Sequence, residues 1–391
     1  MNLRPAITTI LFHCIAVSVA SGQALVLPGD PNFARVEEFF RQQFEPGATA
    51  PQNKLKCSLQ QIPPRVTFNF RFFTGFFVSL PVQQFVGRDK NSIAMVMRAT
   101  PDTPGQQPAY FVYRNDLPEL PKDVGRARFE FSGGFYTGLG KYRVEIALRD
   151  SADRTCTAAW TSTARDRKVP IQLADGQIAP LGYDRWTGMK NTTDGGRVTV
   201  FVHAIPLYYR RALSKLGAFD RTTLLTSLTS LLDQSKFSSA RVVVFDLLGK
   251  RVLFKQDGFD RRGYRRLIDV LERTNYGTVD VKTLQQGGND STFIRNLLRD
   301  EMKETQQSEA IVFLGAEGRP APKALPDLKE YNLPAMFYMG FTRFQVPIED
   351  AMYQAVRSTK GKTITVFRPV DLANGIRSLV QTTSGNSGGA P

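Results

Sequence analysis

The residue with the clearest potential for chemistry is His203, which follows the apolar run Val198–Val202. Such a run is typical of a buried parallel strand, and functional groups of open α/β sheets collect where the strands end. The imidazole is followed by Ala204-Ile205-Pro206, which offer neither a nucleophile nor a metal ligand. No nucleophile elbow accompanies it, because the Gly-x-Ser-x-Gly pattern occurs only at residues 385–389, in the Gly/Ser-rich tail. The pattern therefore favours a structural or surface histidine over a catalytic one.

Other patterns that support catalysis or cofactor binding are incomplete. Gly361-Lys362-Thr363 lacks the upstream glycine of a phosphate-binding loop, because Val356 occupies that position. The glycines from Gly134 to Gly140 lack dinucleotide spacing, and no cluster of Cys and His matches a zinc site. We expect no cofactor, no bound metal and no enzymatic activity. The alternative is a hydrolase that uses carboxylates converging from distant loops.

Arginines are densest in the segment Arg261-Arg262-Gly263-Tyr264-Arg265-Arg266, within a predicted helix over residues 260–272. Residues four apart in a helix share one face, so Arg262 and Arg266 form one pair and Arg261 and Arg265 another. We favour a solvated helix face; the functional interpretation is an anion-binding basic patch. The net charge of +15 is spread along the chain and implies a general affinity for anionic surfaces. Adhesion to acidic glycan is thus an alternative function, and we expect no nucleic-acid partner.

These residues lie in a region, 197–380, where predicted strands alternate with predicted helices. Leu248-Gly249-Lys250 is long enough only for a tight turn, so Arg251–Lys255 must return antiparallel to the preceding strand. The other expected strands are Val198–Val202, Arg241–Leu247, Ala310–Leu314, Ala335–Met339 and Thr363–Phe367. This pattern predicts an α/β Rossmann-like domain with one antiparallel edge strand.

Residues 57–165 follow the period of two that is typical of half-buried strands, as in Val66–Phe72 and Tyr142–Leu148. About seven short strands separated by turn residues predict an antiparallel β-sandwich of immunoglobulin-like pattern. Cys57 and Cys156 fall near its first and last strands. In an exported chain such a pair predicts a disulfide, and two buried free thiols are the alternative.

The N-terminus of the chain suggests export. Arg4 precedes the apolar run Ile7–Ala20 and small residues suited to cleavage, which predicts a signal peptide over residues 1–24. An uncleaved anchor is the alternative, and no later segment is predicted to span a membrane. We expect an amphipathic helix and linker over 25–56, a connector over 166–196 and a disordered tail over 381–391. The predicted location is secreted or periplasmic, in a bacterium.

The order of elements in 197–379 resembles the von Willebrand factor A-type (VWA) domains of exported bacterial proteins. That family binds a divalent cation through an Asp-x-Ser-x-Ser after the first strand, a Thr in a later loop and an Asp after the fourth strand. Here His203-Ala204-Ile205-Pro206-Leu207 and Ala316 occupy the first and last of these positions, and neither offers a hard oxygen ligand. Gly287-Gly288-Asn289-Asp290-Ser291 keeps the composition of the middle loop. The resemblance implies a degenerate metal-ion-dependent adhesion site.

We therefore expect a two-domain, non-enzymatic binding or scaffold protein that makes metal-independent contacts with a protein partner or a cell-envelope component. The resemblance places the binding face on the loops after the first and fourth strands. Aromatic residues and arginine, which are enriched in protein interfaces, occur there. The candidate residues are His203, Tyr208, Tyr209, Arg210, Arg211, Asp290, Ser291 and Glu317.

Overall fold

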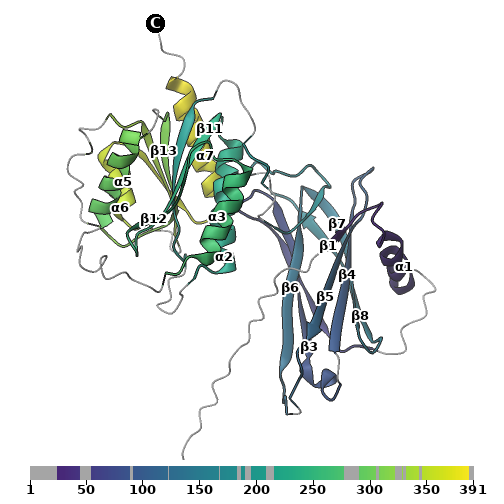
Figure 1. Cartoon of the computed structure of the whole chain (residues 1–391). Coiled ribbons are helices and arrows are strands. Elements are labelled where there is room, and N and C mark those ends of the chain that lie inside the picture. Colours follow the sequence, from purple (N-terminus) through teal and green to yellow (C-terminus); the bar gives the residue numbers. More distant parts are fainter. Residues whose placement is uncertain are drawn as a thin grey trace, which may run out of the picture. The chain divides into compact units, whose positions relative to one another are not determined.

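The computed structural model describes residues 24–44, 54–88, 91–121, 123–166, 168–182, 186–189, 195–207, 215–276, 290–304, 308–321, 328, 332–342 and 346–386. Within them the chain forms six α-helices and fifteen strands, arranged in two antiparallel sheets and one mixed sheet (Figure 1). The predicted signal peptide lies outside the described residues, apart from Ala24 at the start of the first strand.

The expected fold class, a sandwich domain followed by a separate α/β domain, is wrong. The chain forms two compact units that interleave along the sequence: the first takes residues 1–61, 76–133 and 142–162, and the second takes 62–75, 134–141 and 163–391. Strands of the β-rich region are therefore divided between the units, so residue 165 is not a boundary between two independent folds.

Most of the first unit is a five-stranded sheet with the strand order β1-β5-β4-β7-β8. Its strands are β1 (Ala24–Val26), β4 (Asn91–Pro101), β5 (Ala109–Leu117), β7 (Gly140–Asp150) and β8 (Thr155–Ala164). Buried and partly buried residues alternate strictly along β4, as the period of a pleated strand requires. The helix α1 (Phe33–Phe44) covers the outer face, where Phe40 is fully buried against Tyr110 and Val26 (Figure 1).

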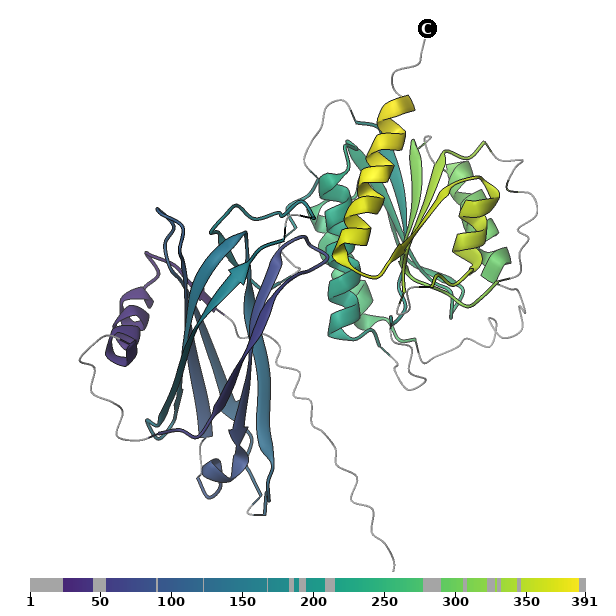
Figure 2. The same cartoon turned by 180° about the vertical axis from the view of Figure 1, so that it is seen from behind.

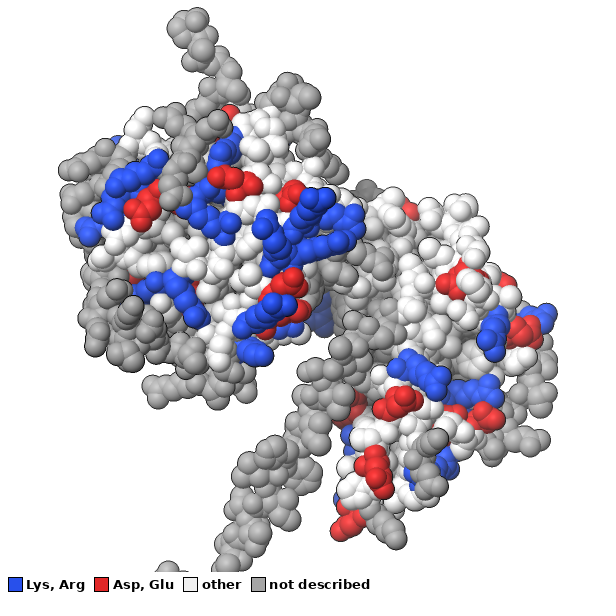
Figure 3. Space-filling view, viewed as in Figure 1, with Lys and Arg blue, Asp and Glu red and all other residues white. Residues whose placement is uncertain are grey.

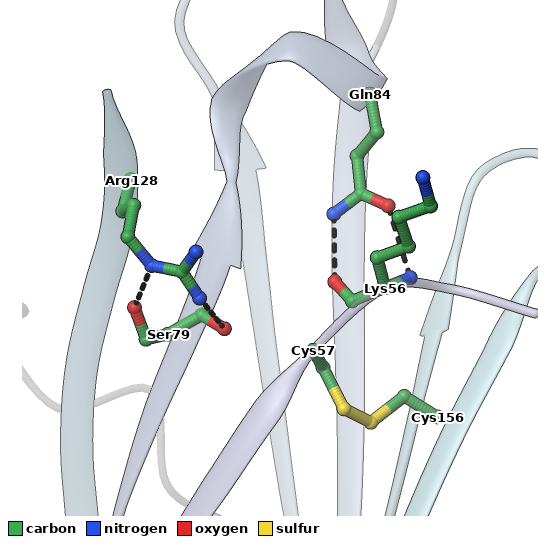
Figure 4. The surroundings of a disulfide bond; sticks show 6 residues. All are labelled: Lys56, Cys57, Ser79, Gln84, Arg128 and Cys156. Carbon is green, nitrogen blue, oxygen red and sulfur yellow. Dashed lines mark hydrogen bonds between the residues drawn. A yellow bond between two sulfur atoms is a disulfide. The ribbon is translucent and has the colours of Figure 1, made fainter. Parts of the chain in front are cut away.

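A disulfide joins Cys57 to Cys156 of β8, with the Cα atoms 6.3 Å apart (Figure 4). Beside it, Gln84 of the short 3-10 helix η1 (Val82–Phe85) fixes the backbone of Lys56 through two hydrogen bonds. The Lys56 amide donates to Gln84 Oε1 at 3.1 Å, and Gln84 Nε2 donates to the Lys56 carbonyl at 2.9 Å. The predicted disulfide is confirmed, and the alternative of two free thiols is wrong.

The four-stranded sheet, ordered β2-β3-β6-β9, explains why the units interleave. Its strands are β2 (Ser58–Val66), β3 (Phe72–Pro81), β6 (Arg128–Thr137) and β9 (Ile178–Pro180). The turn between β2 and β3 belongs to the second unit, where Phe70 is fully buried in the same core as Val198 and Leu228. Phe68 packs against Phe341 at 5.2 Å, and Ser230 Oγ donates to the Phe68 carbonyl at 2.8 Å. The α/β core is thus completed by a hairpin from the β-rich region.

The second unit is built on a six-stranded sheet with the order β12-β11-β10-β13-β14-β15. These strands are β10 (Arg197–His203), β11 (Ser239–Asp246), β12 (Arg251–Gln256), β13 (Ala310–Ala316), β14 (Ala335–Phe341) and β15 (Lys362–Val366). All pair in parallel except β12, which runs antiparallel to β11. The predicted antiparallel return after Leu248-Gly249-Lys250 is therefore confirmed.

Helices cover both faces of this sheet, as the two opposite views show (Figures 1 and 2). One layer contains α2 (Ala218–Gln234), α3 (Arg261–Arg273) and α7 (Pro369–Asn386); the other contains α5 (Asp290–Glu304) and α6 (Ala351–Ser358). Alternate residues of β10 point to the two layers, with Val200 in one core and Phe201 in the other. The helix α7 continues to Asn386, past the start of the tail expected over 381–391.

Candidate functional site

His203 is fully buried at the carboxyl end of β10, and both of its ring nitrogens lie near backbone partners. Nδ1 lies 2.6 Å from the Ala316 carbonyl, and the Leu247 amide donates toward Nε2 at 3.4 Å. A carbonyl only accepts, so Nδ1 carries the proton and Nε2 is the acceptor. Burial lowers the pKa of His203 to about 4, despite the bond to Ala316. The neutral ring thus ties the end of β10 to those of β13 and β11.

The residues that directly follow His203 are packed into the fold. Ala204 is fully buried, Ile205 is nearly so, and the Ala204 amide donates to the Phe245 carbonyl at 2.9 Å. Gly315 of β13 lies against the backbone of His203 with a φ of +141°, and a Cβ there would collide with the His203 carbonyl. Only glycine lets the two strands approach this closely.

The other predicted residues of this face are only partly described. Tyr208, Tyr209, Arg210 and Arg211 lie outside the described residues, as do Gly287, Gly288 and Asn289. Asp290 starts α5 and is half-buried; burial raises its pKa, while Lys250 and Arg319 act in the opposite direction. Ser291 is buried, and its Oγ has no hydrogen-bond partner within the described part of the chain.

A second group of polar residues lies where β13 and β14 end, centred on Asp350, which the sequence analysis did not single out. Asp350 is fully buried and precedes α6, where its Oδ1 accepts from the Tyr353 amide at 2.8 Å. Its Oδ2 accepts from the Gly318 amide at 2.6 Å and from Tyr338 Oη at 2.7 Å. Burial raises the pKa of Asp350, and the three hydrogen bonds oppose that rise. An aspartate before a helix is a sequence signal for a cap, but its other two partners are remote in the chain.

Glu317 is the predicted site residue whose chemistry is most altered by its surroundings. It is half-buried after β13, and its Oε1 accepts from the Ile348 amide at 3.1 Å. Burial raises the pKa of Glu317 to about 7, and the charge of Asp350 adds to the rise. Glu317 and Asp350 together fasten the loop after β13 to the segment before α6.

Two further carboxylates near the strand ends also serve the backbone. Asp246 is buried at the end of β11 and accepts from the Leu248 amide at 2.8 Å and from Arg251 Nε at 3.3 Å, which holds the β11–β12 turn. Asp220 accepts from the Leu207 amide at 3.2 Å. In the described part of the chain, no three His, Cys, Asp or Glu side chains are grouped so as to hold a metal ion.

An open groove of about 440 Å³ lies beside α7, away from the strand ends. Val169, Ala373 and Ile376 give it an apolar floor, and Lys168 and Arg377 are exposed at its rim. Its lining contains no acid, histidine or cysteine, so it offers no group for proton transfer or nucleophilic attack.

The predicted basic patch lies on the exposed side of α3. Arg261, Arg262, Arg265 and Arg266 are all exposed, and Figure 3 shows basic side chains gathered over this helix. Only Arg266 has a described partner, donating from Nη2 to Gln256 Oε1 at 2.6 Å. The structure therefore brings these four residues together on an open surface.

Comparison with known proteins gives no independent guide to these sites. No protein-family model matches the chain, and no curated protein matches it in sequence.

Proposed function

We propose that this chain is an exported, non-enzymatic binding protein whose second unit makes metal-independent contacts with a protein or envelope component. The observation that carries the proposal is the use of polar groups at the carboxyl end of the six-stranded sheet. Three side chains are buried there and form hydrogen bonds with backbone amides and carbonyls: those of His203, Asp246 and Asp350. A group that moves protons for a substrate must instead be able to reach it.

The hydrolase alternative needs two carboxylates that face a shared space. Asp350 is fully buried and accepts three hydrogen bonds, and Asp246 holds a turn. Glu317 is half-buried and has a pKa of about 7, which suits a general acid. It has no catalytic partner among the described residues. These contacts favour binding over hydrolysis.

The disulfide supports action outside the cytoplasm. Disulfides persist in oxidising compartments, and Cys57 is bonded to Cys156. Among the described residues, no helix is long and apolar enough to cross a membrane. The resemblance to VWA-type domains supports a binding face on the loops after β10 and β13.

The test is cross-linking of the purified chain to native cells, with the cross-linked residues mapped by mass spectrometry. We expect cross-links on residues 208–211 or 315–319, at equal yield with Mg²⁺ and with a chelator. Arg210→Glu/Arg211→Glu should lower the yield, whereas Arg35→Glu/Arg357→Glu makes the same charge change at two exposed helical arginines and should not. If cross-linking requires Mg²⁺ and is lost in Asp290→Ala, the proposal is overturned.

A further inference from the structure

The outer face of α3 has an unusual composition for a surface helix. Seven of its residues are exposed, and all seven are charged: Arg261, Arg262, Arg265, Arg266, Asp269, Glu272 and Arg273. The first two turns contain four of the arginines and no acid. The basic end of this face is therefore a continuous cationic surface, visible over α3 in Figure 3.

This arrangement works against the stability of the helix. Arg261 and Arg265, and likewise Arg262 and Arg266, place like charges four residues apart, where they repel. The first turn of a helix also carries the positive end of the helix dipole, which disfavours cations. Asp260, the acid that precedes the first turn, is the N-cap and accepts from the Gly263 amide at 2.7 Å. Helix stability does not account for the cluster.

Neighbouring carboxylates do not account for it either. The ion pairs of the adjacent strand β12 join Arg251 to Asp246 and Lys255 to Glu301. Across the described residues, no ion pair or side-chain hydrogen bond involves Arg261, Arg262 or Arg265. Their guanidinium groups keep their full capacity for an external anion.

The helix holds this surface in a fixed position. Tyr264, Leu267 and Leu271 on its opposite side are fully buried in the core, and Trp186 packs edge-on to Tyr264 at 5.4 Å. With a rise of about 1.5 Å per residue, the four arginines span roughly 7.5 Å along the axis. The spacing suits several anionic groups repeated along one chain, each able to take a bidentate guanidinium contact.

We propose that the basic face of α3 binds an acidic polysaccharide through its carboxylate or sulfate groups. The inference rests on the proposed binding function and names the class of ligand. The exposed residues of α3 include neither the apolar or aromatic anchors typical of protein interfaces nor the side chains that insert into membranes. The Cys57–Cys156 disulfide indicates a compartment where glycans are more frequent partners than nucleic acids.

The test compares retention of the purified chain on immobilised alginate and dextran sulfate, with neutral dextran as the blank. The variant Arg261→Gln/Arg262→Gln/Arg265→Gln removes three charges from side chains without described partners. Its matched control, Arg35→Gln/Arg357→Gln/Arg377→Gln, removes three from exposed arginines of α1, α6 and α7. We expect the patch variant to bind at least about tenfold more weakly at 150 mM salt, with a shallower salt dependence, and the control to bind like the wild type. Circular dichroism verifies that both are folded.

Equal losses in the two variants, or no loss in the patch variant, would refute the inference, because binding would then follow net charge or another surface. If double-stranded DNA displaces the chain from immobilised alginate as effectively as free alginate does, the glycan class of ligand is refuted. Binding to phosphatidylglycerol vesicles that depends on the same arginines would assign the face to membranes instead. If the patch variant loses alginate binding yet still cross-links to cells through residues 208–211, the inference is supported and the proposed binding face acts independently of α3. If the wild-type chain forms no cross-links to native cells, the proposed function itself is refuted.

Discussion

Replacement of Glu317 by Gln should stabilise the protein at neutral and alkaline pH. The pKa of Glu317 is raised from 4.5 to about 7, mainly by burial. Between these values the folded state holds a proton that the unfolded state has released, so the free energy of unfolding falls as the pH rises from 4.5 to 7. Below 4.5 both states are protonated and the penalty is absent. Above 7 it is fully present and no longer changes.

One pKa unit corresponds to about 1.4 kcal/mol, so the penalty at pH 8 is on the order of 1–3 kcal/mol after allowance for partial exposure. Glutamine has no charge to bury, and its carbonyl oxygen can still accept from the Ile348 amide. Glu317→Gln should therefore match the wild type at pH 4 and be more stable by that amount at pH 8.

Urea unfolding at pH 4, 6, 7 and 8 measures this difference directly. Glu349→Gln is the control, because it removes an exposed carboxylate close to Asp350 in the same segment. The pKa of Asp350 is also raised, but comparison of variant with wild type at each pH removes most of its contribution. A Glu317→Gln protein no more stable than the wild type at pH 8, or a gain that does not grow between pH 4 and 7, would refute this reasoning.

Three further substitutions test other contacts by urea unfolding. Cys57→Ser/Cys156→Ser opens a loop of about 100 residues and should cost up to about 4.7 kcal/mol, and reductant should lower the stability of the wild type alone; equal stability would contradict a structural disulfide. His203→Leu leaves a buried amide and carbonyl unpaired and should cost about 2–4 kcal/mol; a neutral effect would show that those groups find other partners. Arg262→Glu puts an acid in the first turn of α3 and should add about 0.3–1 kcal/mol, with Arg273→Glu in the last turn as the opposite control; a loss of stability in Arg262→Glu would mean that Arg262 supports the fold.

Local sequence predicted those parts of the structure that neighbouring residues decide. The short turn around Leu248-Gly249-Lys250 required an antiparallel return, and the pairing of β11 with β12 confirms it. The disulfide followed from the pair Cys57 and Cys156, which remains once the predicted signal peptide, with Cys14, is removed. Each of these depends on residues close together in sequence or on counting.

The sequence did not reveal contacts between distant segments. Asp350 has the signature of a helix cap, but nothing near it indicates the bonds to Tyr338 and Gly318. Phe68 and Phe70 alternate with polar residues like any half-buried strand, so the turn that carries them gave no sign of entering the α/β core. The fold class was wrong for this reason, because a period of two shows which face is buried but not what covers it.

The turn between β2 and β3 also constrains how the chain reaches its native state. The bond from Ser230 to Phe68 spans 162 residues, and contacts of such separation form late and slow the folding of a domain. A fragment that begins at Arg197 would expose the pocket that Phe70 fills, and would be prone to aggregate. The β2–β3 hairpin is therefore synthesised first, and the six-stranded sheet packs against it late in folding. In synthesis from the amino end, that hairpin is available before the strands that need it.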